Sequence, residues 1–166
     1  MSDQPTTESA AFLRDFLVSR IRDEHAATVN VLRALNPGDW RPDPKSKTAI
    51  ELAWHLVHSE RWFLDALANM KCEGGGDGPC PASMEAILNS YESGFEADLA
   101  RLNALTGEQT LTVIDFYGME LPIYVLLNFL HIHTIHHRAQ LATYIRPLGG
   151  KVPDIYGGSA DTPYQP

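Results

Sequence analysis

His131-Ile-His-Thr-Ile-His-His-Arg-Ala-Gln140 decides how this chain is interpreted, because it places four histidines within seven residues of one predicted helix. His133 and His137 are four residues apart, and about 3.6 residues make one helical turn, so both rings lie on the same face. Two imidazoles on one face can bind the same ion, but zinc-like ions take three or four protein ligands. The pattern therefore predicts a metal site that needs a third ligand from another helix.

The helix around these histidines is one of four predicted helices. Each segment carries apolar residues at the three- and four-residue steps of an amphipathic helix. We expect the helices to span about residues 9–35, 48–72, 83–102 and 121–146. Thr48 and Glu51 fit a capping box at the start of the second helix, and Ser83 can cap the third. Four amphipathic helices of this length predict an all-α fold, a four-helix bundle.

The segments outside these helices carry weaker signals. Residues 110–118 alternate partly between apolar and polar, which is compatible with a short strand or an extended arm across the bundle. We expect an irregular crossover there, because a lone strand has no sheet to join. The tail after Arg146 has neither a helical nor a strand period. A chain of 166 residues supports one core, so residues 1–166 are predicted to form a single domain with its ordered part at about 9–161.

Composition excludes several classes of function. The net charge of −8 and the pI near 5.2 argue against nucleic acid or an anionic membrane surface as a partner, since both require clustered Lys and Arg. No stretch reaches the ~18 apolar residues of a membrane span, and the N-terminus is polar and acidic, unlike a signal peptide. We therefore expect a cytoplasmic protein. Cys72 and Cys80 lack the spacing of zinc or redox motifs and are predicted to be two free thiols.

The second predicted helix offers two candidates for the third ligand. His55 and His58 are three residues apart and lie on roughly the same side of that helix. His55 shares its stripe with apolar residues, namely Leu52, Leu56 and Phe63, whereas His58 lies near the boundary of that stripe. We therefore predict His55 as the third ligand and keep His58 as a candidate for supporting a ligand.

The remaining histidines have more ordinary interpretations. His25 is predicted to be a core residue, to line a pocket or to support a ligand. His131 and His136 face away from the ligand stripe, which suits a helix surface, a dimer contact or a supporting role. Glu60 is about 500° of helical rotation from His55 and is expected to be solvated or paired within its own helix. A purely structural bundle with packed, hydrogen-bonded histidines stays an alternative.

Two polar residues follow the last histidine. Arg138 is one step beyond His137 and points away from the ion, so we predict a structural anchor for the tail at Asp154 or Asp161, or for a carboxylate on the first helix. Gln140 is three residues after His137, near the ligand face. Its amide is expected either to orient a ligand imidazole through a hydrogen bond or to meet a substrate.

Three motifs together resemble the DinB-like (DinB/YfiT) metalloprotein superfamily over about residues 12–161. They are Ala53-Trp-His-Leu56, the H-x-x-x-H-R-x-Q pattern of residues 133–140, and the tail Pro147-Leu-Gly-Gly-Lys-Val-Pro-Asp-Ile-Tyr156. The family usually has Gly after the Arg, and Ala139 stands there in this chain. A side chain as small as alanine still allows close helix packing.

The resemblance implies an up-up-down-down four-helix bundle, a homodimer, and one divalent ion bound by His55, His133 and His137. This ligand set agrees with the set that the apolar stripes predict. Nitrogen-only ligation suits zinc, nickel, copper or iron, and we expect zinc or nickel.

The resemblance also bears on activity, because related families include transferases and isomerases that use low-molecular-weight thiols. We therefore expect a metal-dependent enzyme that transfers a small thiol to an electrophile, with a small molecule or thiol as its substrate. The alternative is a non-catalytic metal-binding or stress-related binding protein. The sequence assigns no general acid or base, and a shared bundle does not fix a reaction.

Overall fold

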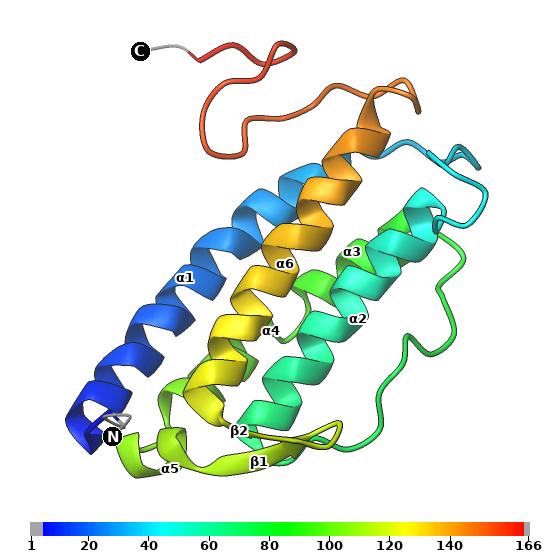
Figure 1. Ribbon diagram of the computed structural model, residues 1–166. Helices are drawn as coiled ribbons and strands as arrows, with labels where there is room; N and C mark the ends of the chain where they lie inside the picture. The colour runs from blue at the N-terminus through cyan, green and yellow to red at the C-terminus, as the bar shows by residue number, and fades with distance from the viewer. Residues whose placement is uncertain (1–4, 165–166) are drawn as a thin grey trace.

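The structure is a computed structural model that describes residues 5–164. Within that range the chain is mainly helical, with one small sheet at one end of the bundle (Figure 1). The elements are α1 (Thr7–Ala34), α2 (Ala49–Ala68), α3 (Met84–Glu92), α4 (Phe95–Asn103), α5 (Gly107–Leu111), β1 (Val113–Phe116), β2 (Met119–Pro122) and α6 (Ile123–Ile145). The predicted capping box is confirmed: Thr48 accepts from the Glu51 backbone, and the Glu51 carboxylate accepts from the Thr48 backbone.

The order of helix directions differs from the expected up-up-down-down arrangement. In Figure 1, α1 and α6 run one way, and α2, α3 and α4 run the other way, which gives up-down-down-up along the chain. Residues 35–48 connect α1 to α2 at one end of the bundle and reverse the chain. Residues 69–83 run back along α2, so α3 starts beside the beginning of α2. Because residues 69–83 return along α2, the consecutive helices α2 and α3 run parallel to each other.

The third predicted helix is two helices in the structure. Ser93 and Gly94 separate α3 from α4, and Gly94 has a left-handed φ of 81°. Glycine adopts this conformation without the steric penalty that a Cβ atom imposes. The apolar period continues through Ile87, Tyr91 and Leu99, which are all buried, and this continuity explains why the sequence predicts one helix.

The expected irregular crossover between the third and last helices is wrong. Thr106 caps the short helix α5, and β1 then pairs with β2 as an antiparallel hairpin, with Phe116 opposite Met119. Tyr117 and Gly118 form the two-residue turn, with φ values of 53° and 84°. The partner strand β2 includes Leu121 and Pro122, which the sequence pattern assigns to the last helix. In the structure that helix begins at Ile123.

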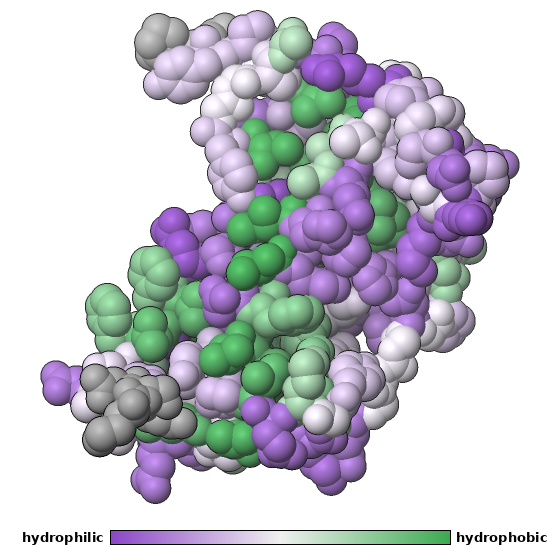
Figure 2. All heavy atoms as spheres, in the orientation of Figure 1, coloured by the Kyte–Doolittle hydropathy of each residue, from purple (hydrophilic) through white to green (hydrophobic). Residues whose placement is uncertain are grey.

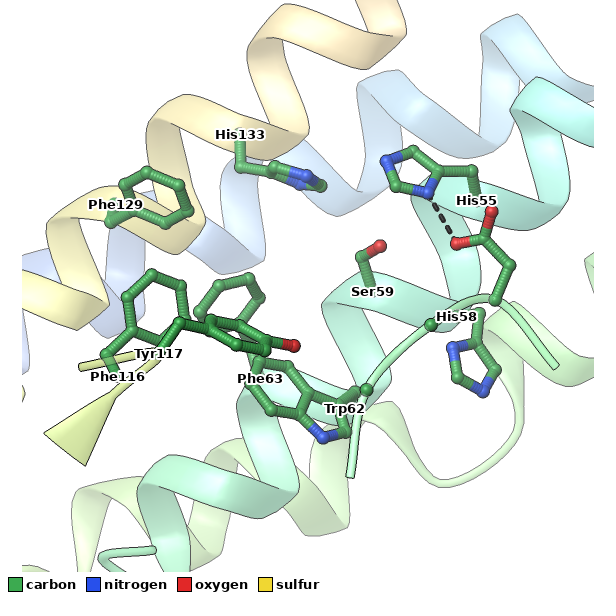
Figure 3. A pocket seen from close by; sticks show the side chains of 12 residues that line it. His55, His58, Ser59, Trp62, Phe63, Phe116, Tyr117, Phe129 and His133 are labelled. Carbon is green, nitrogen blue, oxygen red and sulfur yellow. Dashed lines mark hydrogen bonds and ion pairs between the residues drawn. The ribbon is translucent and has the colours of Figure 1, made fainter. Parts of the chain in front are cut away.

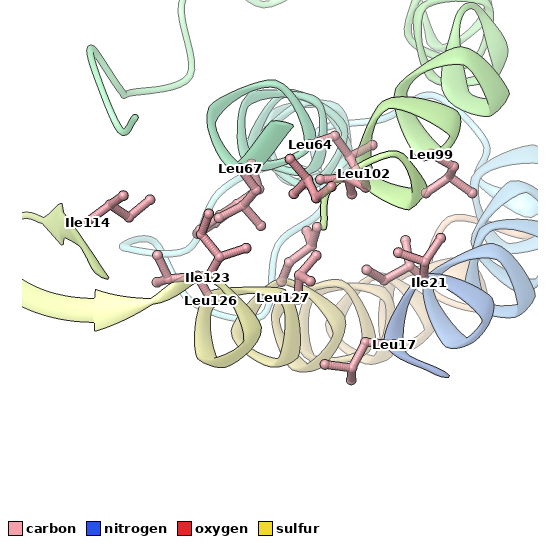
Figure 4. Packing of buried hydrophobic residues seen from close by; sticks show 14 of the residues in the cluster. Leu17, Ile21, Leu64, Leu67, Leu99, Leu102, Ile114, Ile123, Leu126 and Leu127 are labelled. Atoms are coloured by element: carbon pink, nitrogen blue, oxygen red, sulfur yellow. The ribbon is translucent and has the colours of Figure 1, made fainter. Parts of the chain in front are cut away.

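The core surrounds the inner face of α6. Leu126, Leu127 and Leu130 are fully buried there and pack against α2, α4 and α1. Figure 4 shows this packing with α6 facing Leu64, Leu67 and other residues of the same cluster. A second cluster at the opposite end includes Leu141 and Ile145 of α6. His133 and His137 lie on the side of α6 that faces His55 of α2, and the His133 ring lies beside Phe63 of the first cluster.

Arg138 is a buried anchor, with 1% of its surface exposed. It donates to the carboxylate of Glu24 on α1 and to the hydroxyl of Tyr156 in the tail. The Tyr156 hydroxyl in turn donates to Glu24 over 2.6 Å. The prediction that Arg138 binds a carboxylate on the first helix is thus confirmed. Asp161 of the tail is bound by Arg146 instead, over 2.8 Å.

Glu60 is buried, with 1% exposure, so its expected solvated position is wrong. Its Oε2 atom accepts hydrogen bonds from Thr134 over 2.7 Å and from Tyr91 over 3.1 Å. Nδ1 of His25 lies 3.9 Å from the other carboxylate oxygen. The side of α2 turned away from the ligand stripe is also covered, by α3 and α6, and these helices supply the hydroxyl partners.

Several large apolar side chains lie on the surface. Phe12, Phe16 and Ile132 are between 52% and 70% exposed. Figure 2 shows hydrophobic side chains gathered over the first half of α1 and the adjoining part of α6. Every helix among residues 5–164 is too short or too polar to span a lipid bilayer.

Candidate metal centre

The structure brings His55, His133 and His137 together. One nitrogen from each ring lies within 4.8 Å of the nitrogens of the other two. His55 comes from the middle of α2, and the other two come from successive turns of α6. Nε2 of His55 and Nε2 of His137 are 3.2 Å apart. The antiparallel packing of α2 on α6 therefore joins two histidine positions that are 82 residues apart in the sequence.

The outer nitrogens of two rings are held by oxygen acceptors. Nδ1 of His55 donates to a carboxylate oxygen of Asp77 over 2.5 Å, and Nδ1 of His137 donates to the amide oxygen of Gln140 over 2.8 Å. A carboxylate and an amide oxygen only accept, so each Nδ1 carries the ring hydrogen. In the neutral form of either ring, Nε2 then carries a lone pair directed into the cluster.

His133 completes the cluster as a neutral ring. Burial, together with the neighbouring His137 and His55 rings, lowers its pKa from 6.5 to about 4. Burial also lowers the pKa of His137, although its hydrogen bond to Gln140 opposes the shift. Nδ1 of His133 is buried and has no hydrogen-bond partner among the described residues. Neutral imidazoles with free lone pairs are the form in which histidine binds metals.

The cluster fits a metal cation. Two nitrogen lone pairs that face each other at 3.2 Å repel unless a cation lies between them. A proton can join two nitrogens, but a third nitrogen within 4.8 Å matches the three-ligand sets of transition-metal sites.

Asp77 belongs to the site, although the sequence pattern did not indicate it. It lies in the glycine-rich loop that runs back along α2, and this loop is fixed by the indole of Trp62, which donates to the Glu73 carbonyl over 2.8 Å. Burial raises the pKa of the Asp77 carboxyl, but hydrogen bonds from Lys47 and His55 outweigh it, so the pKa lies below its ordinary value. Asp77 is therefore a charged acceptor that holds the His55 ring.

The other histidines lie outside the cluster of three nitrogens. His25 stacks on Tyr91 and Phe95, beside Glu60. His58 packs on Trp54, and Figure 3 shows its ring turned away from His55 and His133. The remaining two occupy different surroundings. His131 lies 3.8 Å from the Glu24 carboxylate, and His136 is exposed, with its ring against the edge of His137.

Cys72 and Cys80 are free thiols, as predicted. Burial raises the pKa of both, and Asp115 adds to the shift at Cys72 while Glu51 adds to it at Cys80. A thiol is nucleophilic as its thiolate, which these environments disfavour. Neither cysteine has the properties of an activated nucleophile.

Two cavities meet at His55. The first, of about 240 Å³, has mainly aromatic walls and is also lined by Asp77 and His133. The second, of about 380 Å³, is more polar and includes Lys47, His137 and Gln140 in its lining. The histidine cluster is therefore accessible to small molecules from two sides.

Three histidines converge from two facing helices of a helical bundle. This arrangement is typical of helical-bundle proteins that place a metal site between their helices. The sequence model of the DinB family matches residues 2–165. The chain therefore belongs to the DinB family.

Individual relatives agree with this assignment. The uncharacterized protein YrdA of Bacillus subtilis (strain 168) is 30% identical over 138 residues, which cover 81% of this chain and 82% of YrdA. The crystal structure of a DinB-like protein from Bacillus cereus ATCC 10987 matches with a TM-score of 0.72 at 28% identity. The matched region covers 84% of this chain and 95% of the Bacillus cereus chain. A DinB-like protein of Bacillus subtilis, YjoA, shares the fold with a TM-score of 0.66 at 23% identity, over 84% of this chain and 96% of its own.

Proposed function

We propose that this protein binds one divalent transition-metal ion, zinc or nickel, through His55, His133 and His137. The observation that carries the proposal is the 3.2 Å approach of two Nε2 atoms whose Nδ1 partners are already hydrogen-bonded. An ion held by three neutral imidazoles keeps its full charge and, when bound, lowers the pKa of a thiol or water beside it. Asp77 and Gln140 hold two of the rings so that their Nε2 atoms face inward.

We propose further that the bound ion serves a reaction between two small molecules, with a low-molecular-weight thiol as the nucleophile. Two cavities that share His55 offer separate places for the two reactants. The polar cavity contains Lys47, Gln140 and Thr143, which suits the polar groups of a small thiol. A metal-binding protein without catalysis needs no such pair of cavities, and this difference favours the enzyme over the non-catalytic alternative.

Metal content tests the first proposal. Protein expressed without an affinity tag is analysed for metals by mass spectrometry, as wild type and as His55→Ala, His133→Ala and His136→Gln. About one equivalent of zinc or nickel is expected in the wild type and in His136→Gln, because His136 is exposed on the same helix. The two alanine variants should lose it. Wild-type metal content in either alanine variant, or no binding after incubation with both metals, contradicts the proposed site.

A conjugation assay tests the reaction. Metal-loaded protein is mixed with a panel of small thiols and 1-chloro-2,4-dinitrobenzene, in which the thiolate sulfur forms the new C–S bond and chloride leaves. The wild type and His136→Gln should accelerate the release of chloride with at least one thiol, and His133→Ala should not. Stoichiometric metal without acceleration by any thiol favours the non-catalytic alternative.

A further inference from the structure

The cavity beside His133 is walled mainly by aromatic rings from three parts of the chain. Figure 3 shows these rings around an open space with His133 and His55 at one end. The aromatic residues are Trp62 and Phe63 from α2, Phe116 and Tyr117 from the hairpin, and Phe129 from α6. Adjacent rings contact one another, with centroids 5.6 Å apart for Phe63 and Phe129 and the same for Phe116 and Phe129.

The lining carries almost no free charge. Its one carboxylate belongs to Asp77, which is already bound by His55 and Lys47. The hydroxyl of Ser59 faces the space between His133 and Tyr117 and offers one polar contact (Figure 3). A charged group between the aromatic walls, away from His55 and His133, would lose its hydration without a partner, so these walls select a neutral group.

The volume limits the size of that group. An apolar cavity of about 150 Å³ already holds a benzene molecule. The cavity here measures about 240 Å³, which leaves room for one substituted ring or two fused rings. Offset and edge-to-face contacts with the surrounding rings favour an aromatic occupant over an aliphatic one.

Tyr117 supports a functional role for this cavity. It is 67% exposed and is the first of the two central residues of the hairpin turn, both of which have positive φ. Asn-Gly and Gly-Gly are the preferred pairs there, and a bulky side chain at a φ of 53° is strained. The phenol nevertheless projects over the cavity toward the glycine-rich loop, where a Cβ at Gly75 would collide with it. A residue that costs stability and borders a cavity points to a ligand that it contacts.

We infer that this cavity binds a neutral aromatic ring of the substrate and places the ring's substituent at His133. The identity of the ring as part of a substrate rests on the proposed function, whereas ring binding itself needs no metal. Phe129, which is 43% exposed and has its ring centroid 6.0 Å from that of His133, would be covered by the bound ring.

Fluorine NMR titration tests the inference. The probe is 4-fluorobenzyl alcohol, and the reference is 4-fluorobutan-1-ol, which has the same hydroxyl and fluorine but no ring. The probe should bind at least tenfold more tightly than the reference, to metal-free as well as to zinc-loaded wild type. Tyr117→Asn and Phe129→Ala should each weaken probe binding at least tenfold.

Matched variants separate this result from unfolding. Tyr117→Asn places the preferred residue type in the turn, so its melting temperature should equal or exceed that of the wild type. Tyr164→Ala removes another exposed tyrosine, in the tail, and should leave probe binding unchanged. Equal binding of probe and reference, or wild-type affinity in both cavity variants, overturns the inference. If the protein binds the probe but binds no metal, the proposed function is contradicted and the inference of ring binding stands.

Discussion

Nδ1 of His55 donates a hydrogen bond of 2.5 Å to Asp77, a residue 22 positions further along the chain. Asp77 also accepts from Lys47 over 2.9 Å and so stays charged while it is partly covered. Histidine ligands of metal sites characteristically donate their second nitrogen to such an acceptor, which fixes the tautomer and the ring orientation. The glycine-rich loop is therefore part of the candidate site.

Replacing Asp77 should weaken metal binding without removing a ligand. Asp77→Ala is expected to lower zinc affinity about 10- to 100-fold, because the His55 ring loses its charged acceptor. Competition with a chelator of known affinity measures the change. Glu73→Ala is the control, since Glu73 lies in the same loop and pairs with Lys71 at the surface. Unchanged affinity in Asp77→Ala would remove this residue from the site.

Gln140 should support His137 in the same way, through its amide oxygen. Gln140→Ala is expected to reduce zinc affinity about tenfold. Gln140→Glu keeps an oxygen acceptor for Nδ1 of His137 and should retain most of the affinity. The same chelator competition compares the two variants. Equal losses in both would mean that the hydrogen bond of 2.8 Å does not orient the ring.

Arg138 should matter for stability rather than for metal binding. Arg138→Ala leaves the buried Glu24 carboxylate without its cation, and breaking a buried pair costs about 3 kcal/mol or more. Urea unfolding of the metal-free proteins measures this loss. The folded fraction should still bind about one equivalent of zinc, because Arg138 points away from the histidine cluster toward α1. A loss of metal stoichiometry in the folded variant would contradict this division of roles.

The sequence predicts those features of this protein that depend on neighbouring residues along one helix. Apolar periodicity places His133 and His137 on one face, and the Thr48 cap fixes where α2 begins. Contacts between a loop residue and a helix cannot be predicted from such periodicity within one helix. Asp77 reaches His55 only because the loop runs back along α2, and a carboxylate among glycines gives no indication of that path.

Two other differences between the predicted and the observed structure also arise from contacts between separate elements. The strand β1 has a partner only because the residues after Gly118 extend the chain before α6 begins, and the helical period of those residues conceals this. Glu60 lies off the ligand stripe, as its helical angle predicts. Its burial depends on hydroxyl groups of Tyr91 and Thr134 from other helices, which a pattern within α2 cannot contain.

Glu24 should make stability depend on acidic pH. Burial raises the pKa of its carboxyl, but hydrogen bonds from Tyr156 and Arg138 outweigh burial, so the pKa in the folded protein is below its ordinary value of 4.5. The unfolded chain then binds the proton more tightly, and the stabilisation is complete above that value and lost as pH falls through the folded pKa. The difference in unfolding free energy between wild type and Glu24→Gln should shrink below about pH 4. A difference that stays constant from pH 7 to pH 3 would exclude this group as the source.

Self-association is the remaining prediction, and the exposed face of α1 and α6 offers a place for it. Phe12, Phe16 and Ile132 are more than half exposed, and contiguous apolar surface of this kind marks protein interfaces in soluble proteins. A two-fold homodimer that buries this face should sediment as a dimer at micromolar concentration. The double variant Phe12→Ser and Phe16→Ser should sediment as a folded monomer. Met119→Ser removes another half-exposed apolar side chain, on the hairpin, and should stay dimeric. A monomeric wild type would refute the dimer, and a dimeric double variant would move the interface to another face.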